Sequence, residues 1–224
     1  MYIKEYIKKI LKKNSRVLKD RVDKSHLKND EFSIFASNCI GGIIYHNLGK
    51  RFLSPTINLW IKPADYIKML NNPKYYFSPG KMKELKNTNE NFPVGVIDDI
   101  KIYGVHYSSF EQLKEKWNER CNRINWNNVV VFMIQRDGAT HADLVAFDKL
   151  PYSKKVVFTK KEYSDIKSSF VLPNSYDVRN DNVNNLCIFK NGHSNIRVID
   201  EFDYVNFINT GKKKVNYKYM WRGI

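Results

Sequence analysis

Cysteine is scarce in this sequence, and its few copies stand far apart. Cys39, Cys121 and Cys187 are an odd number at irregular spacing among 224 residues. This usage excludes a scaffold stapled by disulfides and a zinc motif with closely spaced thiols, and it suits a reducing cytoplasm. His46 and His141 each lie in an expected helix without a second ligand at metal spacing, so we expect no metal site.

Long apolar runs and the common catalytic motifs are also absent. No run of about eighteen apolar residues occurs, and the N-terminus lacks the apolar core and small-residue cleavage site of a secretory signal. The sequence contains no G-x-G-x-x-G, no Walker lysine motif and no G-x-S-x-G elbow. We therefore expect a cytoplasmic protein, either free or peripheral to the inner face of the cell membrane.

Acidic residues are too few to balance the basic ones. The sequence has 38 Lys and Arg against 23 Asp and Glu, a formal net charge of +15, and a pI near 9.6. Such an excess favours an anionic partner, and it leaves open nucleic acid, an acidic membrane surface or a phosphorylated small molecule. Hydrophobic residues make up 42% of the chain, so a folded core is expected beneath this charge.

The N-terminal segment predicts a basic amphipathic helix over residues 1–30. Ile3, Ile7, Ile10 and Leu11 recur there at helical spacing, with lysines between them. The helix could pack on the rest of its own chain, or it could rest on an anionic leaflet, where each lysine contributes roughly 1 kcal/mol. Contact with nucleic acid is a third reading of the same pattern.

Short apolar runs alternate with helical patterns along the rest of the chain. The runs that we expect to be strands are 32–36, 100–105, 129–134 and 156–159, with Cys187–Phe189 as a further candidate. The run 129–134 has no polar alternation, which is typical of a strand covered on both faces. The pattern predicts a single α/β domain over residues 31–224: a layered α/β/α, Rossmann-like domain with a mostly parallel sheet.

Polar residues follow each of the four expected strands. In open parallel sheets ligands bind beyond the carboxyl ends of the strands, where the connecting loops gather. The loop residues that we expect to bind a ligand are Ser37, Asn38, Gly41, Gly42, Tyr107, Arg136, Lys160 and Lys161.

Cys39 is the leading candidate for a reactive group, because it stands between an expected strand and an expected helix. The positive end of a helix dipole lowers the pKa of a nearby thiol, and His106 could act as its base with Asp137 as the orienter. The pattern thus predicts a catalytic Cys39–His106–Asp137 constellation. The same residues also allow a purely structural reading, with a small buried cysteine and glycines that permit tight packing.

Several longer segments carry a resemblance to a known family. They are "SNCIGGIIYHNLG", "LSPTINLWIKPADYIKML", "FPVGVIDDIKIYGVHY", "EKWNERCNRINW", "RDG" and "FDKLPYSKKVVFT". Over roughly residues 32–172 the sequence resembles a bacterial family of domains of unknown function, the one numbered nineteen-nineteen. Its members are often labelled exopolysaccharide-biosynthesis proteins, sometimes acetyltransferases. The resemblance implies an α/β fold and a role in making or modifying a capsule or other surface polysaccharide, and it carries no established catalytic residues.

Three functions remain open at this point. The first is a transferase, such as an acyltransferase, that uses an anionic donor (a CoA thioester or a nucleotide-sugar) and a glycan or glycolipid acceptor at the cytoplasmic membrane face. The second is a non-catalytic module that binds a glycolipid or the membrane surface. The third is nucleic-acid binding through the interleaved lysines and aromatic residues of Lys212–Gly223.

Overall fold

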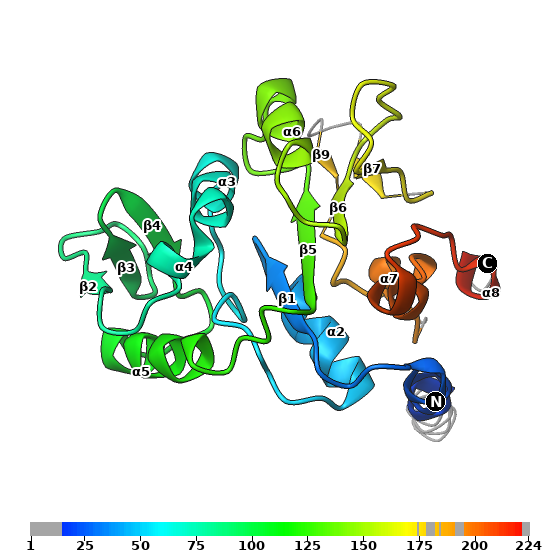
Figure 1. Cartoon of the computed structure of the whole chain (residues 1–224), viewed down its shortest axis with the longest axis horizontal. Helices are drawn as coiled ribbons and strands as arrows, with labels where there is room; N and C mark the ends of the chain where they lie inside the picture. The colour runs from blue at the N-terminus through cyan, green and yellow to red at the C-terminus, as the bar shows by residue number, and fades with distance from the viewer. Residues whose placement is uncertain (1–14, 174, 178–181, 184, 191–194, 221–224) are drawn as a thin grey trace, which may run out of the picture.

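The computed structural model describes residues 15–173, 175–177, 182–183, 185–190 and 195–220. These residues form a mixed α/β structure with a four-stranded parallel sheet, a three-stranded antiparallel sheet and a short two-stranded sheet (Figure 1).

The parallel sheet is the centre of the structure. Its strands are β1 (Ser33–Ala36), β5 (Val129–Ile134), β6 (Lys155–Phe158) and β7 (Ser169–Phe170), in the order β1-β5-β6-β7. Val130 and Phe132 of β5 enter one hydrophobic core, and Val131 and Met133 enter the other. Because successive side chains of a strand point to opposite faces, this division confirms that β5 is covered on both sides.

Helices cover both faces of this sheet. In Figure 1, α2 (Ile40–Leu48) and α7 (Tyr204–Thr210) lie on one side, and α3 (Pro63–Asn71) and α6 (His141–Asp148) lie on the other. The core residues agree, since α2 and α7 share a core with Phe132, whereas α3 and α6 share one with Val131 and Met133. The layered arrangement that the sequence predicted is therefore present.

The antiparallel sheet corrects one prediction. The run 100–105 does form a strand, β4 (Ile100–Tyr103), but it pairs with β3 (Val94–Ile97) and not with the parallel sheet. The two strands are joined by Asp98-Asp99, and Asp98 has a φ of 52°, so the chain reverses within two residues. The order is completed by β2 (Lys83–Glu84) on the other edge of β3.

The antiparallel sheet lies within the connection between two neighbouring strands of the parallel sheet, where a simple Rossmann-like unit has one helix. The connection from β1 to β5 is not a single helix but holds α2, α3, α4 (Pro73–Tyr76), the antiparallel sheet and α5 (Phe110–Cys121). The Rossmann-like topology thus stays a prediction.

The later part of the chain is built from short elements. The candidate strand Cys187–Phe189 forms only an isolated bridge, between Phe189 and Arg197. The remaining elements are β8 (Tyr176–Asp177) with β9 (Asn182–Val183), the 3-10 helix η1 (Val198–Glu201) and α8 (Tyr217–Met220).

Buried ions hold the helix over residues 15–26. Asp200 is buried in η1, and its carboxylate lies 2.6 Å from Arg16 Nη1 and 2.9 Å from Lys19 Nζ. Lys19 Nζ also lies 2.5 Å from Asp23 Oδ2 on the next turn of its own helix. This segment is therefore helical and attached through charge. The apolar positions 3–11, on which the amphipathic prediction rested, lie outside the described residues.

None of the helices in the described part of the chain combines the length and the apolarity that crossing a bilayer requires.

We predict that Asp200→Asn lowers the free energy of unfolding by about 3 kcal/mol, because it removes the buried carboxylate shared by Lys19 and the half-buried Arg16, each of which keeps one further carboxylate partner. The matched control is Asp99→Asn, which breaks an exposed ion pair with Lys68 and should leave stability nearly unchanged. Urea denaturation of both variants measures the difference. Equal midpoints for the two variants would contradict the structural role given to Asp200.

Candidate functional site

The structure brings together two residues that are 67 positions apart in the sequence. Cys39 immediately precedes α2, at the end of β1, and His106 follows β4. Cys39 Sγ lies 3.1 Å from His106 Nε2, within hydrogen-bonding distance for a sulfur atom. The contact joins the two residues that the sequence predicted as nucleophile and base, and these two roles stay predictions.

The contact arises by a route different from the predicted one, because β1 and β4 belong to different sheets. A connecting segment joins them: Ile61 N donates to Ser37 O at 2.9 Å, and Trp60 exchanges two hydrogen bonds of 2.9 Å with Tyr103. The end of β1 and the end of β4 are therefore fixed to the same short stretch of backbone.

Tyr107 and Arg120 support the turn that carries His106. Tyr107 donates from its hydroxyl to Ile57 O at 3.0 Å, and the buried Arg120 donates to that hydroxyl at 2.6 Å and to Ile57 O at 3.3 Å. The Tyr107 hydroxyl, which the sequence predicted to bind a ligand, is thus engaged within the chain. Sequence reasoning missed Arg120, whose only signal was a cation on the apolar stripe of α5 between Trp117 and Cys121.

Burial dominates the electrostatics of the thiol. It raises the pKa of Cys39 above its ordinary value, and the nearby charge of Arg136 only partly opposes this. The expected lowering by the helix start is therefore outweighed, and at neutral pH the group is a thiol rather than a thiolate. An attack by sulfur would need a base to remove the proton, and His106 is in place to do so.

Asp137 has a different partner from the predicted one. Its Oδ2 accepts a hydrogen bond of 3.1 Å from Arg136 Nε. Among the described residues, Asp137 makes no hydrogen bond to His106, whose Nε2 contacts Cys39 Sγ. Asp137 has a φ of 58° and is followed by Gly138 at 84°, a left-handed pair that turns the chain sharply after β5. Asp137 therefore positions Arg136, whose charge acts on Cys39.

Gly41 and Gly42 lie where neighbouring groups approach the backbone closely. A Cβ on Gly41 would lie 3.2 Å from Ile34 Cγ2 of β1, and a Cβ on Gly42 would lie 2.8 Å from Asn58 Oδ1. Asn58 itself has a φ of 60°, a conformation that asparagine tolerates better than most residues. The glycines thus admit a strand on one side and the Asn58 side chain, which sequence reasoning missed, on the other.

The other predicted residues lie around the same strand ends. Asn38 Oδ1 accepts a hydrogen bond of 3.1 Å from Ile40 N, the first amide of α2. Lys160 N donates to Gln135 Oε1 at 3.0 Å, which ties the loop after β6 to the loop after β5. Lys161 Nζ lies 5.4 Å from the centroid of the Tyr163 ring.

The structure offers no metal centre among the residues that it describes: no three His, Cys, Asp or Glu side chains are grouped as ligands. His141 pairs with Asp165 at 3.1 Å.

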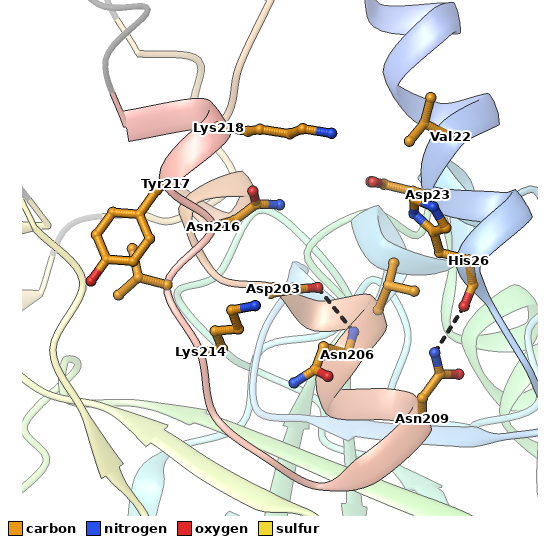
Figure 2. A pocket seen from close by; sticks show the side chains of 12 residues that line it. Val22, Asp23, His26, Asp203, Asn206, Asn209, Lys214, Asn216, Tyr217 and Lys218 are labelled. Atoms are coloured by element: carbon orange, nitrogen blue, oxygen red, sulfur yellow. Dashed lines mark hydrogen bonds between the residues drawn. The ribbon is translucent and has the colours of Figure 1, made fainter.

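A cavity of about 440 Å³ lies elsewhere, between the helix 15–26, α7 and the chain around α8 (Figure 2). None of the predicted site residues lines this cavity. We place the candidate reactive site at Cys39 because the contact with His106 has a defined chemistry, which a cavity alone does not have.

Comparison with known proteins gives two findings. The family described as a domain of unknown function (DUF1919) matches residues 10–209, as the resemblance in the sequence predicted. An uncharacterized protein of Haemophilus influenzae is 32% identical over 203 residues, which cover 91% of this chain and 96% of that protein. Neither description states an activity.

We predict that alkylation of Cys39 by iodoacetamide rises with pH through a midpoint above that of an exposed thiol, because burial raises its pKa. Arg136→Ala should move the midpoint further up, since it removes a charge that favours the thiolate. Arg123→Ala is the control, because Arg123 pairs with Glu119 on α5. Mass spectrometry of the Cys39 peptide gives the profile, and a midpoint unmoved by Arg136→Ala would contradict the assignment.

Proposed function

We propose that this chain, which belongs to the DUF1919 family of domains of unknown function, is a transferase that modifies a bacterial surface glycan at the cytoplasmic face of the membrane. The observation that carries the proposal is the 3.1 Å contact between Cys39 Sγ and His106 Nε2 at the start of α2. A thiol paired with an imidazole is the arrangement by which cysteine nucleophiles are activated.

The reaction that best suits this pair is transfer of an acyl group from a CoA thioester. His106 Nε2 takes the Sγ–H proton as Cys39 forms a bond to the acyl carbon, and the bond from that carbon to the CoA sulfur breaks. The departing CoA thiolate receives the proton from His106. A hydroxyl of the acceptor glycan then attacks the acyl-enzyme, its proton passes through His106, and the Cys39 thiol is restored.

The surrounding groups have roles in this proposal. The amides of Gly41 and Gly42 precede the first intrahelical bond, which runs from Ile43 N to Cys39 O at 3.1 Å, and they could stabilise the oxyanion. Arg136, positioned by Asp137, would hold the phosphates of the donor, with Lys160 and Lys161 on the adjacent loop. A nucleotide-sugar would offer the same diphosphate chemistry to Arg136.

The two other functions are alternatives that do not use the contact between Cys39 Sγ and His106 Nε2. A non-catalytic module that binds a glycolipid or the membrane surface would use charge outside this site. Nucleic-acid binding would use the lysines and aromatic residues near the C-terminus, of which residues 212–220 are described.

We predict that incubation with acetyl-CoA places an acetyl group on Cys39 and that Cys39→Ala abolishes it. His106→Ala should slow the acetylation by roughly 10²–10⁴-fold, because it removes the general base. The control is His46→Ala, which changes an exposed histidine on α2. Rapid quenching and mass spectrometry of the Cys39 peptide measure the rate. Equal acetylation in the Cys39→Ala variant, or none in the unaltered protein, would contradict acyl transfer through this thiol.

A further inference from the structure

The cavity in Figure 2 lies beside a surface that combines exposed apolar side chains with cations. We call this surface the cationic face and define it by Leu18, Val22, Lys214, Tyr217 and Lys218. All of these except Leu18 line the cavity, and Leu18 lies one helical turn from Val22 on the same side of its helix. In Figure 2 Lys218 extends from α8 across the cavity toward Val22.

The acidic residues that line the cavity are already engaged. Asp23 Oδ2 lies 2.5 Å from Lys19 Nζ and accepts a hydrogen bond of 2.6 Å from the Tyr204 hydroxyl. Asp203 Oδ1 accepts a hydrogen bond of 2.9 Å from Asn206 N, where it caps α7. The charge that this surface presents to solvent is therefore positive, from Lys214 and Lys218.

The apolar members of the cationic face are unusually exposed for their type. Leu18 is 59% exposed, Val22 is 40% exposed and Tyr217 is 67% exposed. Large apolar side chains rimmed by cations mark a site of interaction with an anionic, partly apolar partner. A bilayer surface offers both features at once, and tyrosine is enriched where headgroups meet acyl chains.

We infer that the cationic face docks on a bilayer that contains anionic phospholipid. Lys214 and Lys218 contact the lipid phosphates, and Leu18, Val22 and Tyr217 enter the boundary with the acyl chains. This inference uses a surface separate from the Cys39 site, and it holds whether or not the protein is a transferase. It places the membrane contact on the second half of the predicted N-terminal helix and on the C-terminal part of the chain.

The test is flotation of the full chain with vesicles of phosphatidylcholine, alone or mixed with phosphatidylglycerol. We expect binding to the mixed vesicles only, and a loss of about thirtyfold in partitioning for the double variant Lys214→Gln/Lys218→Gln, the contribution of two surface lysines. The matched control is Lys83→Gln/Lys86→Gln, which removes the same charge from exposed positions at the antiparallel sheet. Leu18→Ser/Val22→Ser should also weaken binding.

The outcomes separate the possible sources of binding. Equal losses in the two lysine pairs would mean that only net charge matters, and they would overturn the inference, as would a complete absence of vesicle binding. Displacement of the protein from vesicles by millimolar inorganic phosphate, with no effect of the same concentration of chloride, would indicate a site for free phosphate instead. Cys39→Ala should bind vesicles normally, so failure of the proposed chemistry and failure of docking are distinguishable.

Discussion

The site depends on a few backbone hydrogen bonds that attach the antiparallel sheet to the end of β1. Ile61 bonds to Ser37 on one side, while its neighbour Trp60 bonds twice to Tyr103 on the other. Buried backbone groups must find partners, so these bonds fix how the two sheets meet. The distance between Cys39 and His106 is a consequence of that junction, because each stands within a few residues of a bonded strand end.

The burial that forms this junction also decides the state of the thiol. Removing Cys39 from water raises its pKa more than Arg136 can lower it, so the protonated thiol is favoured beside His106. Such a pair differs from a preformed thiolate, which would be reactive towards many electrophiles. At neutral pH such a thiol needs a base to take its proton before it attacks, and in the proposed function His106 is that base. If the proposed transfer takes place, the same burial would limit reactions of the thiol with other electrophiles.

The sequence predicted single strands and helices better than it predicted how the antiparallel sheet attaches to the end of β1. The apolar run 129–134 predicted a strand covered on both faces, and the structure shows one. The hairpin around Asp98 could also be predicted from the sequence, since two short alternating runs flank a two-residue polar turn. The roles of Arg120 and Asn58 could not be predicted from the sequence, because each contacts residues that only the tertiary fold brings near. His106 does lie at Cys39, but it arrives there from the antiparallel sheet and not, as predicted, from the end of a strand in the parallel sheet.

The net charge of +15 is a poor guide to the partner until the cations are located. Arg16 and Lys19 belong to the basic N-terminal segment, yet both turn inward to Asp200 and so add little to the outer field. Lys214 and Lys218 stand at the surface beside apolar side chains, where a lipid phosphate could reach them. The ions of the first kind attach the helix that carries Leu18 and Val22 to η1, which also contacts α8, the helix that carries Lys218. Structural and interacting charges are therefore coupled, and a partner is better inferred from the cations that remain outside than from the total.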